Sequence, residues 1–319
     1  MTLDTIGVVA FDTNLGGLDG SRALYQAIID VGHYVMMRPL RPFRNLYIKL
    51  FPNSNSAKKD KKPLAQLSAE WEKLTDEVLE RKDAPPDLEP IWAGLKRFID
   101  PETEQPLTYE SVLMETAFVV ISGMDTTGHQ LAWILALLAS NPDKAEKLIE
   151  ELKSHGLCGK DARHVTFDDL AELPYLTAII KEGMRVAHIL IGSFFRSVPQ
   201  DMTILGYRVP AGTKVMFPCS RFMCSEAEWG DPDTFRPERW LTGEDMSQKC
   251  NLGFSFGPRD CVGQRLAMME IRVALTRLIP NYTFSNTVPL SDLLNNIRNG
   301  VAIEARDGIW LNVSPRHHV

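Results

Sequence analysis

The segment NLGFSFGPRDCVGQ, Asn251 to Gln264, carries the pattern from which the fold and chemistry of this chain are predicted. It is a glycine-punctuated loop that presents Cys261 just before an amphipathic, helix-forming stretch. A thiolate there lies near peptide N–H groups and the positive end of the helix dipole, which stabilise its charge and favour metal ligation. Gly257 lets the backbone turn, and Gly263 leaves room for a flat ligand. Arg259 supplies a cation suited to a carboxylate on that ligand.

The spacing F-x-x-G-x-R-x-C-x-G is met in full by Phe254, Gly257, Arg259, Cys261 and Gly263. It resembles the haem-thiolate signature of the cytochrome P-450 family. The resemblance implies a haem b cofactor whose iron is bound by Cys261 and whose propionate is held by Arg259. The competing interpretation is that Cys261 is a small buried hydrophobe at a loop–helix junction, as free cysteines often are. The match at all specified positions favours the metal ligand.

The composition is that of an ordinary globular chain. With 319 residues, of which 44% are hydrophobic and 24% are charged, the chain can form one large core or two smaller ones. A formal net charge of -6 gives no global nucleic-acid-binding surface, because phosphate binding needs clustered cations. The five cysteines form no C-x-x-C pair, and a chain of this size needs no disulfides. We therefore expect a reducing compartment, or a face open to the cytosol.

Apolar residues recur at helical intervals over much of the chain. The predicted helices are Leu64–Arg81, Thr108–Ser140, Pro174–Val186 and Val262–Ile279. Thr108 is expected to cap the second of these, and Thr166 with Asp169 forms another capping signature. Because the second helix is long and apolar on most sides, it should cross the core.

The remaining segments predict a minor β part and exposed connections. Short alternating segments at Arg196–Val198, Thr203–Val209 and Lys214–Phe217 are typical of a small sheet. The low-complexity segment Asn53–Lys62 is interpreted as an exposed connector, with a membrane-surface contact as the alternative. The stretch Cys224–Gly257 is rich in Pro, Gly and Asp and predicts a long ordered loop. The fold class is therefore mainly α with small β-sheets, and the resemblance implies a partial cytochrome P-450 fold.

The N-terminal sequence shows no membrane anchor. No apolar run reaches the roughly 18 residues of a transmembrane helix, and TLDTIGVVAFDTN follows Met1 without the features of a signal peptide. Eukaryotic members of the resembled family are longer at this end and keep a membrane helix there. We therefore expect residues 1–319 to form a single partial domain, the C-terminal two thirds of a microsomal-like member without its N-terminal helices and sheet strands. For the full-length protein the resemblance favours the cytosolic face of the endoplasmic reticulum membrane, with a plastid as the alternative.

Weak helix formers interrupt the long predicted helix at SGMDTTG, Ser122–Gly128. Small residues let a bulky partner approach, and a Thr hydroxyl bonded to the carbonyl of residue i-4 can open a local bulge. Asp125 beside Thr126 forms an acid and hydroxyl pair suited to a proton relay. The alternative is a kinked core helix with a solvated Asp. The segment resembles the oxygen-activating motif A/G-G-x-D/E-T-T/S of the same family, from which Ser122 departs because Ala or Gly is usual there.

Glu182 and Arg185 share one face of a predicted helix and can form a charge-assisted pair, although such pairs are common by chance. The sequence FRPERW, Phe235 to Trp240, resembles the family segment P-E-R-F, in which an Arg joins the E-x-x-R pair. The resemblance assigns Arg239 to that role. We expect a buried triad that positions the loop leading to the cysteine.

Other polar residues take their expected roles from the resemblance. Arg196 matches the position of a second propionate-binding cation, and the alternative is an ordinary charge on an edge strand. The basic residues Lys249, Arg265 and Arg272 flank the signature loop and are expected to dock an acidic reductase. His129, near the proposed relay, is interpreted as a core or pocket-wall residue.

The resemblance implies a monooxygenase that inserts one oxygen atom from O2 into a small lipophilic substrate. Thiolate ligation by Cys261 favours O–O cleavage, and Asp125 with Thr126 would deliver the protons. A separate reductase, expected to use NADPH, would supply electrons, because the chain shows no flavin or iron–sulfur signature. Two alternatives stay open: a haem-thiolate isomerase or dehydratase, which the presence of Thr126 disfavours, and a non-catalytic truncated fragment unable to hold haem.

Overall fold

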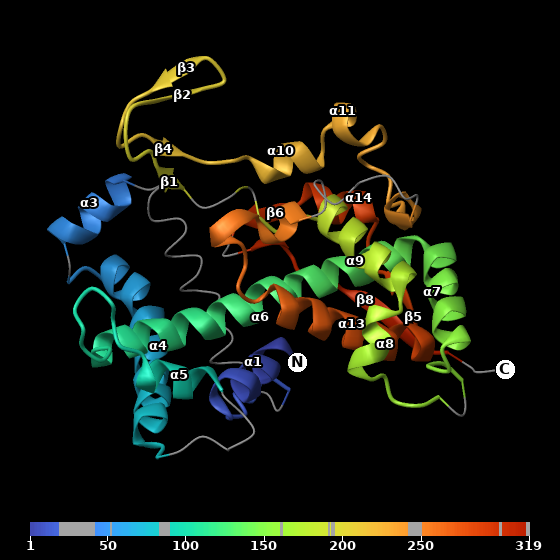
Figure 1. Cartoon of the computed structure of the whole chain (residues 1–319), viewed down its shortest axis with the longest axis horizontal. Helices are drawn as coiled ribbons and strands as arrows, with labels where there is room; N and C mark the ends of the chain where they lie inside the picture. Colours follow the sequence, from blue (N-terminus) through green and yellow to red (C-terminus); the bar gives the residue numbers. More distant parts are fainter. Residues whose placement is uncertain are drawn as a thin grey trace. The chain divides into compact units, whose positions relative to one another are not determined.

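A computed structural model describes residues 1–18, 42–51, 53–82, 90–159, 162–190, 192, 195–241, 251–299 and 302–316 (Figure 1). The chain divides into two compact units. The first comprises Met1–Gly128 and Asn299–Ala302, and the second comprises His129–Arg298 and Ile303–Val319. Each unit is described by itself below.

The first unit is helical. Its helices are α1 (Thr2–Phe11), α3 (Pro42–Leu50), α4 (Asn55–Glu80), α5 (Ile91–Arg97) and the first part of α6 (Tyr109–Ser140). Helix α1 contacts α5, and its residues Leu3, Ile6 and Phe11 are buried. A further buried residue is Trp92 of α5, over whose ring the guanidinium of Arg81 lies at 5.4 Å from the centroid. This apolar cluster stabilises the unit by removing large side chains from water.

The long helix α6 follows the prediction closely. It begins at Tyr109, and the Oγ1 of Thr108 accepts a hydrogen bond of 3.2 Å from the backbone N–H of Ser111, as expected of an N-cap. The helix continues to Ser140, and Asn141 then precedes Pro142 of the next helix. In the second unit its residues Trp133, Ile134 and Leu137 are buried in the core, whereas Met114 and Phe118 in the first unit are exposed. The prediction that the helix crosses the core therefore holds for its second part only.

The predicted connector at Asn53–Lys62 is wrong. Helix α4 already begins at Asn55 and runs without a break to Glu80. Lysine and alanine are good helix formers, so the repeated lysines of this segment are compatible with a helix as well as with a solvated loop. The helix predicted for Leu64–Arg81 is confirmed as the later part of α4.

The second unit combines helices with short strands. Its α-helices, besides the rest of α6, are α7 (Pro142–Ser154), α8 (Phe167–Ala171), α9 (Pro174–Val186), α10 (Cys219–Met223), α11 (Glu226–Trp229), α13 (Gln264–Asn281) and α14 (Leu290–Asn295). The described residues of this unit also form the 3-10 turns η1 (Pro237–Leu241), η2 (Asn251–Phe254) and η3 (Gly257–Arg259). The predicted long loop at Cys224–Gly257 therefore contains short helical turns, and its residues 242–250 lie outside the described part of the chain.

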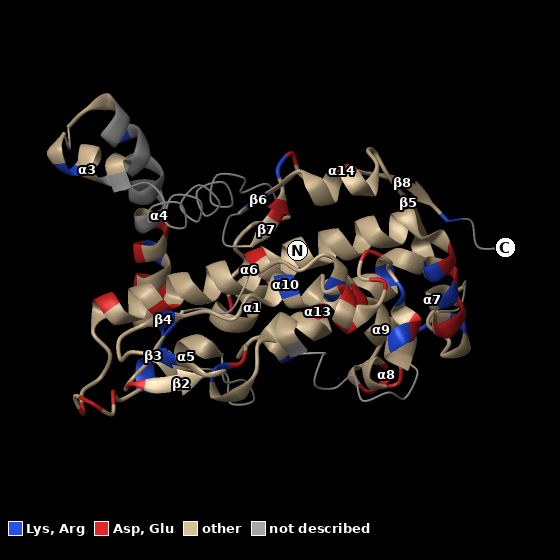
Figure 2. Ribbon diagram, turned by 90° about the horizontal axis from the view of Figure 1, so that it is seen from above, with Lys and Arg blue, Asp and Glu red and all other residues tan. Residues whose placement is uncertain are grey.

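The core of the second unit lies among α6, α7, α9 and α13. Leu137, Leu152, Leu176 and Leu275 are fully buried there. The capping box predicted at the start of α8 is confirmed, because Thr166 and Asp169 exchange side-chain and backbone hydrogen bonds. Helix α7 is rich in basic and acidic residues, which are blue and red along its ribbon in Figure 2.

The strands form two-stranded sheets. The pairs are β1 (Arg196–Ser197) with β4 (Lys214–Val215), β2 (Met202–Ile204) with β3 (Tyr207–Val209), β5 (Tyr282–Asn286) with β8 (Leu311–Pro315), and β6 (Ile297–Asn299) with β7 (Ile303–Ala305). The first three pairs are antiparallel. The single small sheet expected between residues 196 and 217 is thus two separate pairs, and the mainly α fold class is confirmed. Within the described ranges, no helix has the length and apolar character needed to cross a membrane.

Candidate functional site

The signature loop has a defined backbone that leaves its cysteine open. Ser255 and Gly257 both have positive φ, of 63° and 80°, so the chain turns sharply before the cysteine. The backbone N–H of Cys261 donates to the carbonyl of Phe254 at 2.8 Å and closes the loop. Helix α13 then starts at Gln264, with Gly263 as its N-cap. The thiol of Cys261 is free and exposed, so the small buried hydrophobe interpretation is not what the structure shows.

The space around this thiol suits an external ligand. A Cβ added at Gly263 would meet only the Sγ of Cys261, at 3.9 Å. Phe254 is partly buried against the core of the unit, whereas Arg259 is exposed. Arg196 on β1 is also exposed, and its Nη1 donates to the carbonyl of Phe195 at 3.3 Å. The loop therefore presents a sulfur and a cation to solvent while its aromatic residue anchors it.

The structure brings Glu182, Arg185 and Arg239 together in a buried cluster, hereafter the Glu182 network. Glu182 is fully buried, and its carboxylate accepts from Arg185 Nη2 at 2.9 Å and from Arg239 Nε at 3.0 Å. Two further donors were not identified from the sequence, the indole of Trp240 at 2.9 Å and the backbone N–H of Arg236 at 2.9 Å. With donors from four residues on one carboxylate, the buried charge is well satisfied.

Both arginines of the Glu182 network also bind the backbone of the segment before η1. Arg185 donates to the carbonyls of Met223, Pro232 and Thr234. Arg239 donates to the carbonyl of Trp229 at 3.1 Å and to the carboxylate of Asp231 at 2.8 Å, and this second bond lowers the pKa of Asp231. The network thus fixes the stretch from Met223 to Thr234 by binding several of its backbone carbonyls.

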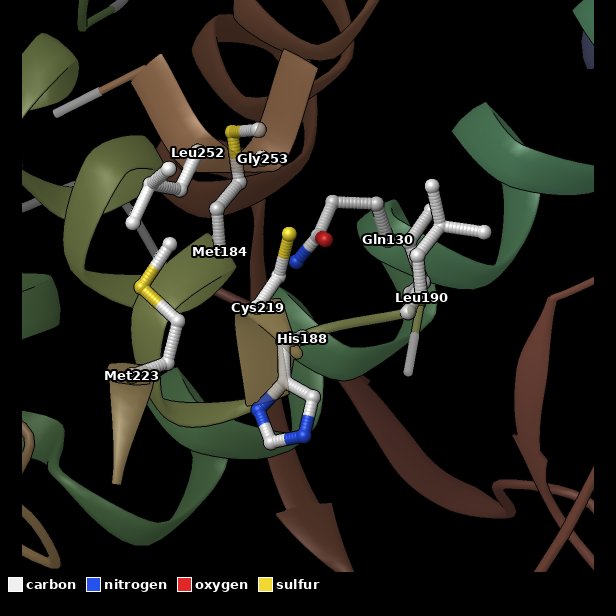
Figure 3. Close-up of a pocket in the computed structure, with 9 residues that line it drawn as sticks. Gln130, Met184, His188, Leu190, Cys219, Met223, Leu252 and Gly253 are labelled. Carbon is white, nitrogen blue, oxygen red and sulfur yellow. The ribbon is translucent and has the colours of Figure 1, made fainter. Parts of the chain in front are cut away.

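A small cavity lies next to this network in the second unit (Figure 3). Its lining includes Met184 of α9, His188 just beyond the end of that helix, Cys219 and Met223 of α10, and Gly253 of η2. A side chain at Gly253 would collide with the terminal methyl of Met184. Because Gly253 directly precedes Phe254, this contact fixes the start of the signature loop against α9.

The predicted relay segment lies in the first unit as an uninterrupted part of α6. The Oγ1 of Thr126 donates to the carbonyl of Ser122 at 2.7 Å, as predicted, but the backbone remains α-helical and no bulge opens. Asp125 is 5% exposed, and its Oδ2 accepts from the backbone N–H of Ala302 at 3.0 Å. Asp125 is therefore a buried, bonded carboxylate, and the solvated alternative is wrong.

The glycines of this segment admit a helix of the same unit. A Cβ at Gly123 would lie 2.7 Å from the Cδ1 of Ile6, and one at Gly128 would lie 3.1 Å from the Oγ1 of Thr2. Small residues on α6 therefore let α1 approach closely. The sequence predicted a bulky partner here but could not identify it as α1.

His129 forms a contact that the sequence did not indicate. In the second unit its Nε2 lies 3.0 Å from the Oε2 of Glu304 on β7, and the other carboxylate oxygen of Glu304 accepts from Arg298 Nε at 2.6 Å. His129 is partly buried, in agreement with a wall or core position. The residues of this cluster come from segments with no shared motif.

The three predicted docking cations differ in exposure. Arg265 at the start of α13 is exposed, but Arg272 is half-buried and its Nη2 donates to the Oγ1 of Thr177 at 3.1 Å. Burial lowers the pKa of Arg272. The Arg272 guanidinium is thus directed to α9 rather than to a partner, and Lys249 lies outside the described residues.

The donor set is compatible with a single protein ligand to a metal. No group of three or more His, Cys, Asp and Glu side chains that could hold an ion occurs in the described ranges. A metal bound here by protein atoms alone would therefore lack ligands. The exposed Cys261 suits a metal whose remaining ligands come from a cofactor, and the open space beside Gly263 suits a flat one.

Comparison with known proteins places this geometry in one family. The Cytochrome P450 family model matches residues 1–308. "Putative cytochrome P450 CYP13A5" of Caenorhabditis elegans is 31% identical over 219 residues, which are 68% of this chain and 41% of that protein. "Cytochrome P450 3A6" of Oryctolagus cuniculus is 30% identical over 245 residues, which are 76% of this chain and 46% of the relative.

A solved structure, "Crystal structure of cytochrome P450DA heme domain", is similar in fold with a TM-score of 0.77 at 23% identity. The similarity covers 99% of this chain and 66% of that chain, and it confirms the predicted partial fold. The regions that match the two curated relatives amount to less than half of each relative's length. On the match of the family model over residues 1–308, the chain belongs to the cytochrome P450 family.

Proposed function

We propose that this chain carries the haem-binding and oxygen-activating part of a haem-thiolate monooxygenase. The observation that carries the proposal is the exposed, free thiol of Cys261 in a closed loop, with open space beside it at Gly263. Bound haem would supply the activation of O2 for insertion of one oxygen atom into a small lipophilic substrate. The thiolate of Cys261 would bind the iron and donate electron density to it.

Two exposed arginines supply the cations that a haem needs at its edge. Arg259 makes no ion pair in the part of the chain that the structure describes, so its guanidinium is available to a propionate. Arg196 is the second candidate; it is exposed, and its Nη1 donates a hydrogen bond of 3.3 Å to the carbonyl of the neighbouring Phe195. Phe254, Gly257 and Gly263 shape the loop around the sulfur.

Asp125 and Thr126 are proposed to hold and move protons. The hydroxyl of Thr126 is oriented by its hydrogen bond to the carbonyl of Ser122. The carboxylate of the preceding residue, Asp125, is buried. An acid and a hydroxyl held at neighbouring positions of one helix can hold a proton and pass it on. Ser122 in place of Ala or Gly leaves this bond intact, because the acceptor is its backbone carbonyl.

The Glu182 network is proposed to hold in place the chain that leads into the signature loop. It binds the backbone around residues 223–239, and Met184 on the same helix contacts Gly253. None of its members needs to touch the substrate for this role.

Electrons, substrate and location are the further parts of the proposal. A separate NADPH-dependent reductase is expected, and exposed Arg265 is the best-placed cation for docking it. The full-length protein is expected at the endoplasmic reticulum membrane. The relatives compared above are animal proteins, so the plastid alternative has no support.

Haem loading with a cysteine control tests the central claim. The chain supplied with hemin, reduced and exposed to carbon monoxide, should give a thiolate-type difference spectrum. Cys261→Ala should abolish that spectrum, whereas Cys224→Ala, which removes another exposed free cysteine, should leave it unchanged. A thiolate spectrum in Cys261→Ala would disprove the ligand assignment. Failure of every variant, including wild type, to bind haem would favour the non-catalytic alternative.

Turnover distinguishes the remaining alternative. Product formation that requires neither O2 nor NADPH would indicate an isomerase or dehydratase. Product that requires both and contains one atom of labelled oxygen supports the monooxygenase.

A further inference from the structure

One carboxylate in the first unit joins two segments that are far apart in sequence. The Oδ2 of Asp125 accepts a hydrogen bond of 3.0 Å from the backbone N–H of Ala302, 177 residues away. Both residues are buried, at 5% and 2% exposure. A buried main-chain N–H needs an acceptor, and a carboxylate makes a stronger bond than a neutral oxygen. The contact therefore fixes the carboxylate and the backbone at Ala302 in one arrangement.

The strand that follows Ala302 is itself firmly held. Within the second unit, every residue of β7 is buried, and the backbone N–H of Ile303 donates to the carbonyl of Ile189 at 2.7 Å. The carboxylate of Glu304 is bonded by His129 at 3.0 Å and by Arg298 at 2.6 Å. β7 is therefore anchored within the second unit through both its backbone and a side chain.

We propose that the backbone at Ala302, directly before β7, is a positioning element for the proton relay, with the Ala302 N–H orienting the Asp125 carboxylate. This inference rests on the proposed function, in which Asp125 and Thr126 move protons. Ala302 belongs to no catalytic motif, and its proposed effect on the relay is exerted through Asp125. Its part in the relay follows from a main-chain contact that is independent of the Ala302 side chain.

Two substitutions at Asp125 separate positioning from proton transfer. Asparagine keeps an oxygen that can accept from Ala302 but cannot act as the acid, and alanine does neither. Amide hydrogen exchange at Ala302, measured by mass spectrometry on the whole chain, should rise at least about tenfold in Asp125→Ala. In Asp125→Asn it should stay within about threefold of wild type, because the weaker, neutral bond remains.

Thr126→Ala is the matched control for this measurement. Its hydroxyl donates to Ser122 within the helix, so its loss should leave exchange at Ala302 unchanged. Wild-type exchange in Asp125→Ala would overturn the positioning contact. Increased exchange in Thr126→Ala would also overturn it, because loosening of the helix would then explain both results.

A substitution on β7 tests whether the contact matters to the relay. Glu304→Ala removes the shared acceptor of His129 and Arg298, and Glu304→Gln keeps an oxygen for one of them. In haem-loaded protein with a reductase, Glu304→Ala should raise peroxide release per product about threefold, and Glu304→Gln should partly restore coupling. Wild-type coupling in Glu304→Ala, despite faster exchange at Ala302, would overturn the proposal. Absence of any monooxygenase activity would instead refute the proposed function, and the exchange experiment would still decide the contact.

Discussion

The Glu182 network and the Cys261 loop lie in the same unit but are built in opposite ways. Glu182 is fully buried and accepts from arginine, tryptophan and backbone donors. Cys261 is exposed, and its neighbour Val262 is 100% exposed. The difference shows that the structural and chemical parts of the site are separate. Buried charges hold the backbone, and the group that would bind metal contributes almost no packing of its own.

Breaking the buried part should have the largest effect. Glu182→Ala leaves the guanidinium groups of Arg185 and Arg239 buried without their carboxylate, so the free energy of unfolding should fall by about 3–5 kcal/mol. Urea denaturation of the haem-free chain followed by circular dichroism measures this. Glu150→Ala, an exposed position on α7, is the control and should change stability by less than about 0.5 kcal/mol. A small effect of Glu182→Ala would show that the network is not the support of this unit.

A pair of glycines sharpens the comparison. A Cβ at Gly183 would lie 2.5 Å from the Cγ1 of fully buried Ile134, a stiff β-branched side chain. Gly183→Ala should therefore destabilise the chain by about 1–3 kcal/mol, although alanine is the better helix former. Gly263→Ala should alter stability by less than about 0.5 kcal/mol but weaken haem binding, since its Cβ enters the open space beside Cys261. Denaturation and hemin titration of both variants check this, and equal stability losses would contradict it.

Glu238, the neighbour of Arg239 on η1, should have a smaller effect on stability, and that effect should depend on pH. Burial raises the pKa of Glu238, but hydrogen bonds from Lys147, Lys144 and Tyr175 outweigh it and lower the pKa from its ordinary value of 4.5 to about 2. This carboxylate therefore stabilises the fold above pH 4.5, and the contribution is lost as the pH falls toward 2. Because Glu238 is partly exposed, we expect its ionised carboxylate to contribute only about 1 kcal/mol to the free energy of unfolding.

Acid denaturation of Glu238→Gln tests this sign. The variant should be less stable than wild type at neutral pH, and the difference should shrink as both are taken to low pH. A difference that stays constant from neutral pH to pH 2 would contradict a contribution from the ionised carboxylate.

The smallest effect on stability is expected at the cysteine itself. Cys261→Ala should change the free energy of unfolding of the haem-free chain by less than about 0.5 kcal/mol, because the thiol is exposed. Thermal or urea denaturation measures this. A loss above about 1 kcal/mol would mean that the sulfur packs against the chain, and the division between support and chemistry would then fail.

Local patterns explain what could be predicted. The capping box of Thr166 and Asp169, the N-cap at Thr108 and the start of α9 at Pro174 each depend on residues within a few positions of one another. The i, i+3 pair of Glu182 and Arg185 is likewise local, and its contact is present as expected. Such local signals can be identified without knowing how the rest of the chain folds.

Long-range contacts explain which features could not be predicted from the sequence. Sequence patterns did not show that Trp240 would bind Glu182, that Arg272 would turn to Thr177, or that Ala302 would bind Asp125. The prediction for the lysine-rich start of α4 was wrong for another reason. Lysine suits both a helix and a solvated loop, and burial of the rest of the helix decides between them.

By itself the sequence determined the spacing of the cysteine signature, the helix boundaries set by caps and proline, and the mainly α class, because these depend on neighbours along the chain. The tertiary structure alone decided that the thiol is exposed, that α1 fills the space left by the α6 glycines, and that a distant backbone N–H holds Asp125. The physical reason is that burial and main-chain hydrogen bonding between remote segments depend on which surfaces meet after folding, and no residue pattern encodes those surfaces locally.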